Sequence, residues 1–164
     1  MDTGNFNQAQ FHINNVTGPD EYTCIDKNTY YTNAIAQYHL TWAVKLYYNL
    51  RKLPAFKKMQ RKIQLRYEEI SAFKKAASKM YLPYDEKLKI NPQDDSFLQK
   101  KPWDISSIPK KNFPLLLHYH PLHLYRYQLC NQPDTVLSHF ILEDVQSLET
   151  IKNSFNYYEK CTTH

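Results

Sequence analysis

The sequence predicts a mainly α-helical protein, because helical periodicity dominates the chain and strand-like segments are few. Apolar residues recur at helical spacing near residues 32–53, 67–80 and 147–160. Only residues 11–13 and 87–90 alternate in the manner of strands. Successive amphipathic helices with few strands suit a toroid of paired helices.

The first predicted helix follows a short strand at residues 11–13 and runs from about Thr32 to Leu53, where Pro54 ends it. Its apolar stripe should be core rather than a ligand site. The stripe consists of Ala34, Ile35, Tyr38, Trp42, Leu46 and Leu50.

The later elements are shorter. A second helix is expected from Tyr67 to Met80, residues 87–90 should form an edge strand, and residues 99–113 should be loop. A short helix should follow Pro121, and Pro133 is suited to open the next. Ser147 can cap a final helix that reaches about Lys160. The predicted inner face of that helix is Leu148, Ile151, Phe155 and Tyr158.

Composition places the chain among globular proteins, since 42% of its residues are hydrophobic and 15% aromatic. Its only glycines are Gly4 and Gly18, which is few for a complete domain, so we expect a piece of a longer one. Three unpaired-looking cysteines favour a reducing compartment. No run approaches the ~20 apolar residues that cross a bilayer, so we expect a cytoplasmic protein with no membrane partner.

The net charge of +5 is concentrated in one segment. Residues 51–66 contain seven basic side chains and no acidic one. Such a cluster can contact phosphates of nucleic acid or an anionic surface. A solvated connector is the favoured interpretation because charge runs usually are that, and no nucleic-acid motif accompanies this one, so no nucleic-acid partner is expected.

The candidate chemistry lies in Gly18-Pro19-Asp20-Glu21-Tyr22. Glycine tolerates backbone angles that other residues avoid and proline fixes one dihedral angle, so the pair predicts a turn. The turn displays Asp20 and Glu21 just before a helix packed into a core, an arrangement that suits a general acid. Taken alone, the motif is more typical of a solvated surface turn, because Gly-Pro-Asp-Glu occurs in many such turns.

This stretch resembles the acid-bearing loop of glycoside hydrolase family 65, which contains the maltose, trehalose and kojibiose phosphorylases. Similarity to maltose phosphorylases continues in order along the chain. It covers residues 16–22, 28–33, 80–86, 93–95, 97–98, 101–104, 114–121, 125–128, Gln132, Asp134, 153–159 and 162–164. The segments Leu-Leu-Leu-His-Tyr-His-Pro at 115–121 and Tyr-Tyr-Glu-Lys at 157–160 resemble maltose phosphorylases most.

The resemblance implies that residues 1–164 are one partial domain from an (α/α)6-barrel catalytic domain. It also implies an inverting phosphorolysis of maltose, in which Glu21 is the general acid and Asp20 shapes the turn. The substrates are then a disaccharide and phosphate, the products β-glucose 1-phosphate and glucose, and no cofactor or metal is needed. Full-length relatives are expected to be homodimers, and the isolated 164-residue chain should be inactive.

Two further residues carry an implied role. Where the family commonly has a Lys-Gln pair contacting the ligand, this chain has Asn131 and Gln132. We therefore expect Asn131 and Gln132 to bind substrate, with a neutral amide in place of a cation. The family's phosphate-binding loops are expected beyond His164 and its glucose-gripping segment before Met1.

Other candidates favour structural roles. Asp94 and Asp95 are adjacent, and adjacent side chains diverge in extended backbone, so a turn-stabilising role is expected. The spacing of His118, His120 and His123 superficially suits a metal, but no carboxylate or thiol completes a ligand set. Two alternatives for the whole chain stay open: a trehalase-like hydrolase with a further carboxylate base, and a non-enzymatic helical interaction module.

Overall fold

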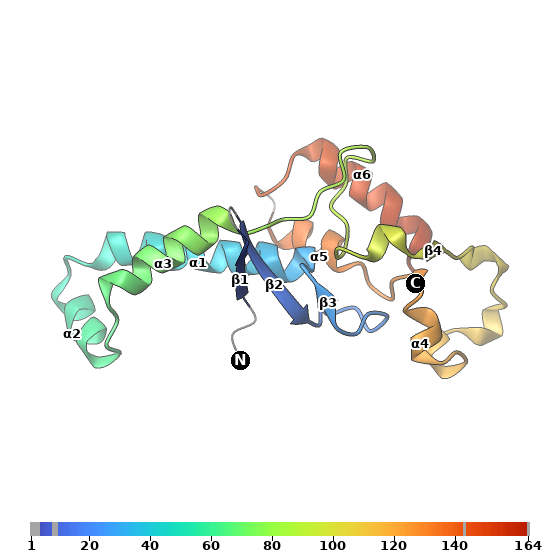
Figure 1. Ribbon diagram of the computed structural model, residues 1–164, viewed down its shortest axis with the longest axis horizontal. Helices are drawn as coiled ribbons and strands as arrows, with labels where there is room; N and C mark the ends of the chain where they lie inside the picture. Colours follow the sequence, from blue (N-terminus) through green and yellow to red (C-terminus); the bar gives the residue numbers. More distant parts are fainter. Residues whose placement is uncertain (1–3, 8–9, 143, 164) are drawn as a thin grey trace.

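The computed structural model describes residues 4–7, 10–142 and 144–163. About half of the chain is helical, and the molecule is elongated, with α2 at one end and α4 near the other (Figure 1). The α-helices are α1 Tyr30–Leu50, α2 Pro54–Lys62, α3 Tyr67–Lys79, α4 Pro121–Leu124, α5 Asp134–Ile141 and α6 Leu148–Tyr158. The strands are β1 Gly4–Asn7, β2 Gln10–Val16, β3 Asp26–Lys27, β4 Lys101–Pro102 and β5 Tyr127–Gln128.

A small antiparallel sheet brings the chain to its candidate chemistry. Its order is β1-β2-β3, with Phe6 opposite Phe11 in the first pair and Val16 opposite Asp26 in the second. The predicted strand at residues 11–13 is therefore confirmed within β2. Because β2 and β3 pair directly, the intervening residues 17–25 form a loop that is closed at its base, beside the start of α1 (Figure 1).

Helices α1 and α3 confirm the two long helices predicted first, and α3 returns alongside α1 (Figure 1). The predicted α1 core stripe is wrong in its middle part. Tyr38, Trp42 and Leu46 are exposed, while Ala34 and Tyr47 are buried. Other positions of α1 pack on α3: Tyr47 clusters with Ile70, and Gln37 Nε2 donates to the Ala77 carbonyl. Periodicity therefore identified an apolar face but not the residues that meet a partner.

The basic segment, interpreted from the sequence as a solvated connector, contains a helix, since nine of its residues make up α2. Pro54 begins this helix, where its missing N–H costs no hydrogen bond. An open groove of about 1120 Å³ lies between α1, α2 and α3 and is lined by Arg51, Lys57 and Arg61 among others. Glu21 is not among the residues that line this groove.

The prediction of a strand at residues 87–90 is wrong. These residues form a tight turn that a single bridge between Asp85 and Ile90 closes. Asp85 accepts a hydrogen bond from the Leu88 backbone N–H at 2.7 Å, which stabilises the turn in place of a strand partner. Lys89 has a φ of 53°, a left-handed conformation incompatible with a regular strand.

The final helix begins as predicted, because the Ser147 hydroxyl accepts a hydrogen bond from the Thr150 N–H at 3.1 Å. Of its predicted inner face, Tyr158 is fully buried and Ile151 half-buried, whereas the prediction is wrong for the other two residues. Leu148 is 84% exposed and Phe155 55% exposed, while the buried side consists of Thr150, Ser154 and Tyr158. Hydrogen bonds explain this choice: the Tyr158 hydroxyl donates to the Asn91 carbonyl, and the Ser154 hydroxyl accepts from the Asn91 N–H.

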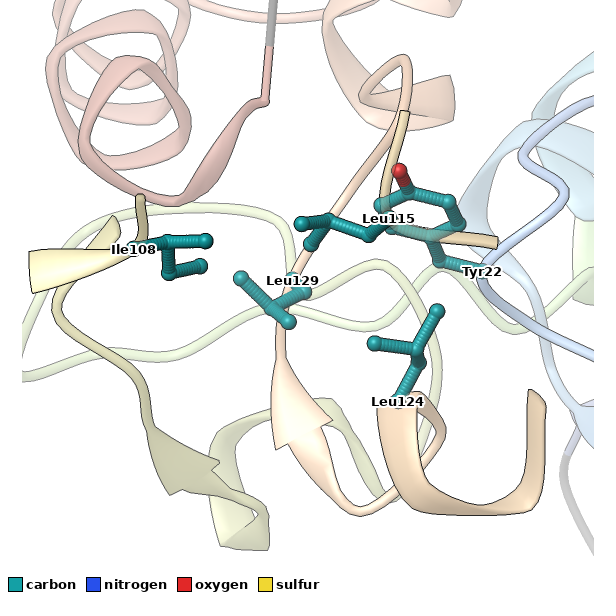
Figure 2. Close-up of a cluster of buried hydrophobic side chains, with 5 residues drawn as sticks. All are labelled: Tyr22, Ile108, Leu115, Leu124 and Leu129. Atoms are coloured by element: carbon teal, nitrogen blue, oxygen red, sulfur yellow. The ribbon is translucent and has the colours of Figure 1, made fainter. Parts of the chain in front are cut away.

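Among the residues that the structure describes, the apolar interior is divided into four small clusters rather than one core. One of them lies beneath the loop that follows β2, and Figure 2 shows its side chains converging from segments far apart in the chain. It consists of Tyr22, Ile108, Leu115, Leu124 and Leu129. Within the described residues, none of the helices has the length and apolarity that a bilayer crossing requires.

Candidate active site

The acid loop, residues 17–25, presents two adjacent carboxyl groups in opposite environments. Asp20 is completely buried, whereas Glu21 is exposed. Tyr22, the next residue, is 2% exposed and points into the cluster of Figure 2. The Thr17 hydroxyl also donates to the Cys24 carbonyl at 2.7 Å across the base of the loop. Glu21 is thus held outward between two anchored neighbours.

Asp20 accepts hydrogen bonds from three directions. Its Oδ1 accepts from the backbone N–H groups of Asn131, at 2.9 Å, and Tyr22, at 3.2 Å. Its Oδ2 accepts from the Gln93 side chain at 2.8 Å. Burial raises the pKa of Asp20 above its usual value, and these donors partly offset that effect. An aspartate so enclosed organises the loop and has no free face for a substrate.

Glu21 meets the second predicted pair of residues. The Asn131 side-chain amide donates a hydrogen bond to Glu21 Oε2, and the Gln132 amide donates to the Pro19 carbonyl at 3.0 Å. Glu21, Asn131 and Gln132, more than 100 residues apart in sequence, therefore lie together in the structure. Asn131 contacts the carboxyl group directly, while Gln132 contacts the backbone of the loop.

Gln93 and Asp134 complete the support of the loop. While Gln93 Nε2 donates to Asp20, its Oε1 accepts the Asp134 backbone N–H at 3.1 Å. Burial raises the pKa of Asp134 to about 7. The Asp20 backbone N–H lies nearby without reaching hydrogen-bond geometry and partly offsets this rise, whereas the charge of Asp20 adds to it. Sequence reasoning assigned no role to either residue, although both lie in segments that carry the family resemblance.

The reason for a glycine at position 18 differs from the one predicted. Gly18 does not have a positive φ, so its backbone conformation is open to other residues. A Cβ atom at this position would lie only 1.9 Å from Asp134 Oδ2 and 3.1 Å from its Cγ. Close approach of the Asp134 side chain, rather than a special dihedral angle, requires glycine here.

The segment after the loop positions α1 rather than contributing to the exposed site. Asn28 is buried with a φ of 53°, a left-handed conformation that asparagine tolerates. Its side-chain amide donates to Asp95 Oδ2 at 2.7 Å, and that of Asn33 donates to the Tyr81 carbonyl at 2.7 Å. Asp94 accepts from the Ser96 N–H at 2.7 Å, which confirms its turn-stabilising role.

The three spaced histidines have other partners. His120 Nδ1 accepts a hydrogen bond from the Leu122 N–H at 3.2 Å and so caps α4. The His123 ring packs against Trp103, with ring centroids 5.5 Å apart. Among the residues that the structure describes, no group of three histidine, cysteine, aspartate or glutamate side chains is placed to hold a metal ion.

Comparisons with known proteins agree on one family. The family model described as "Glycosyl hydrolase family 65 central catalytic domain" matches residues 1–164. The chain is 55% identical to an α,α-trehalose phosphorylase of Geobacillus stearothermophilus, over 100% of the chain and 22% of the relative. It is 46% identical to that of Thermoanaerobacter brockii, over 94% and 20%, and 27% identical to the maltose phosphorylase of Bacillus subtilis (strain 168), over 94% and 20%.

The fold is similar to a solved structure as well. A candidate kojibiose phosphorylase from the human microbiome superposes with a TM-score of 0.87 at 27% identity, over 99% of this chain and 22% of that one. The chain thus spans about a fifth of the length of the relatives it matches.

Proposed function

Because the chain belongs to glycosyl hydrolase family 65, whose central catalytic domain it matches, we propose that it forms part of an inverting disaccharide phosphorylase in which Glu21 is the general acid. In this reaction a carboxylic acid protonates the departing glycosidic oxygen while the nucleophile arrives from the opposite face of the sugar. Phosphate is already an anion, so it needs a cationic, hydrogen-bonding cradle rather than a carboxylate base. The products are β-glucose 1-phosphate and glucose.

The observation that carries this proposal is the contrast between the two adjacent carboxyl groups. Asp20 is buried and its oxygens are occupied by Asn131, Tyr22 and Gln93, whereas Glu21 is exposed on a loop anchored from both sides. A general acid has to reach the substrate from a fixed position. Glu21 meets both requirements, and its longer side chain extends its reach.

The rest of the site would come from other parts of the enzyme. We propose that the 164 residues contribute the acid loop and several helices to an (α/α)6 barrel, and that phosphate and the non-reducing glucose are held largely by residues outside them. Asn131 and Gln132 would contact the ligand beside Glu21. Homodimerisation and a cytoplasmic location stay predictions.

The disaccharide we propose is α,α-trehalose. Its support is the gradient of identity, 55% and 46% to trehalose phosphorylases against 27% to a maltose phosphorylase. Maltose, which the sequence motifs favoured, stays the second candidate on the strength of residues 115–121 and 157–160. A trehalase-like hydrolase would differ from both phosphorylase candidates, because it would cleave its substrate without phosphate.

A chimeric enzyme tests the function directly. Residues 1–164 would replace the matching segment of the Geobacillus stearothermophilus trehalose phosphorylase, and the corresponding Bacillus subtilis maltose phosphorylase segment would serve as the matched control. We expect phosphate-dependent cleavage of trehalose and release of β-glucose 1-phosphate, measured by NMR. A folded chimera that prefers maltose would assign the substrate to the second candidate. Cleavage without phosphate, or none, would contradict the proposal.

Asn131→Lys in this chimera should lower the KM for disaccharide or phosphate by about fivefold, because a charged donor forms a stronger hydrogen bond to an oxyanion than an amide does. The ammonium group would also stand beside Glu21, so the alkaline limb of the kcat profile should move to lower pH. Steady-state kinetics between pH 5 and pH 9 would measure both changes. Asn156→Lys, which adds the same charge on an exposed part of α6, is the control, and an equal or higher KM in Asn131→Lys alone would refute the role.

A further inference from the structure

Asp134, the first residue of α5, is an unusual buried acid. It is completely buried, and neither of its carboxyl oxygens has a hydrogen-bond partner among the described residues. Burial of a polar group without a partner costs free energy, so such a group calls for a specific explanation. The raised pKa of Asp134 is consistent with a neutral carboxyl group, which is easier to bury than a carboxylate.

The position of the Asp134 side chain suggests what it does. Its Oδ2 occupies the space where a side chain at position 18 would begin, since a Cβ atom there would lie 1.9 Å away. Gly18 lies in the acid loop directly before the bend at Pro19, two residues before Asp20. The acid loop therefore packs against the Asp134 carboxyl group at Gly18, two residues before the buried Asp20.

The same short segment holds the loop at further points. The Asn131 N–H binds Asp20, the Asn131 amide binds Glu21, and the Gln132 amide binds the Pro19 carbonyl. Gln93 joins the Asp134 backbone to the Asp20 side chain. Residues 131–134 therefore contact every residue from 18 to 21, and Glu21 is the one whose carboxyl group remains exposed.

We propose that Asp134 is a positioning residue for the general acid, acting through its close contact with Gly18. This inference rests on the proposed function of Glu21 and extends it to a residue that touches neither substrate. The Asp134 side chain sets the distance between the acid loop and α5, and this distance determines the position of the Glu21 carboxyl group. Gly18 and Asp134 then act as one unit, and neither position tolerates a change in volume without compensation at the other.

A double-mutant cycle in the chimeric enzyme tests the contact. Gly18→Ala should lower kcat for trehalose phosphorolysis by about 10²-fold, because the new Cβ atom displaces the loop. Asp134→Ala should lower kcat about tenfold, because the loop loses the side chain against which it packs. In the double variant the alanine at position 18 fills the vacated space, so it should cost no more than Asp134→Ala alone. Asp104→Ala, which removes an exposed aspartate from a distant turn, is the control and should leave kcat unchanged.

A second readout separates positioning from stability. Loss of acid placement should lower kcat with trehalose far more than with glucosyl fluoride, whose leaving group needs little protonation. Asp134→Asn, similar in shape and neutral, should keep kcat within about threefold of the unsubstituted chimera for both substrates. Asp134→Ser replaces the alanine variant in the cycle if the latter does not fold.

The outcomes distinguish a failure of the role of Asp134 from a failure of the proposed function of Glu21. Additive effects of Gly18→Ala and Asp134→Ala, or equal losses on both substrates that follow the melting temperature, would overturn the positioning role. If Glu21→Gln itself lacks a leaving-group-dependent loss, the proposed function fails first. If Glu21→Gln shows that loss and the cycle is additive, only the role of Asp134 is wrong.

Discussion

Glu21→Gln in the chimeric enzyme should lower kcat for trehalose phosphorolysis by about 10²–10⁴-fold, the range associated with loss of a general acid. Glutamine preserves the shape of the side chain and the contact with Asn131 but carries no transferable proton. The loss should be much smaller with glucosyl fluoride, because fluoride departs with little protonation. Parallel kinetics on trehalose and glucosyl fluoride would measure the difference.

Asp20→Asn provides the matched comparison, since it removes one charge from the adjacent residue. An asparagine replaces one acceptor oxygen with a donor, so at least one of the bonds from Asn131, Tyr22 or Gln93 is lost. We expect a lower melting temperature and a loss of similar size on both substrates. If Asp20→Asn showed the leaving-group dependence and Glu21→Gln did not, the assignment of the acid would be reversed.

The isolated 164-residue chain should have no measurable phosphorylase activity and should self-associate. Large apolar side chains are exposed on α1, α5 and α6, among them Trp42 at 39%, Phe140 at 76% and Leu148 at 84%. At roughly 25 cal/mol per Å², a few hundred Å² of exposed apolar surface corresponds to several kcal/mol, comparable to the stability of a whole domain. In the proposed (α/α)6 barrel these faces would pack against other helices.

Light scattering after size-exclusion chromatography, together with binding of a hydrophobic dye, would test this expectation. Replacing Phe140, Leu148 and Phe155 with glutamine should reduce both self-association and dye binding. Exchanging the exposed polar residues Glu149, Lys152 and Asn156 for glutamine is the control and should change neither. A monomeric wild-type chain with a cooperative melting curve would favour the helical interaction module instead, and phosphate-dependent cleavage by the purified chain would refute the expectation outright.

Local sequence was sufficient for the boundaries of several elements, because local interactions decide them. Pro54 cannot continue a helix and begins the next, and Ser147 has a hydroxyl that accepts an N–H of the first turn of α6. The alternation in residues 11–13 likewise belongs to a strand. Only the family resemblance placed Asn131 and Gln132 near the site of the acid loop, because no local interaction joins residues more than 100 positions apart in the chain.

The direction in which each helix faces depended on partners that periodicity does not specify. In α6 the apolar residues Leu148 and Phe155 lie outward, because Ser154 and Tyr158 bond to the backbone of Asn91. The Asp85 side chain similarly favours a turn at residues 87–90 over the strand that alternation indicated. In α6 hydrogen bonds to distant backbone outweighed the local apolar pattern, and at residues 87–90 a local side-chain hydrogen bond outweighed the alternation.

The sequence by itself determined the main helices and a loop carrying two carboxyl groups, since these follow from spacing and turn residues. It predicted both Asp20 and Glu21 on display, and only the family resemblance selected Glu21. Only the tertiary structure decided that Asp20 is buried, that Gln93 joins it to α5, and that Gly18 is required by the nearness of Asp134. Each of these depends on segments 41 or more residues apart in the chain meeting within a few ångströms. Such meetings are set by the packing of the whole domain, which no local pattern of residues encodes.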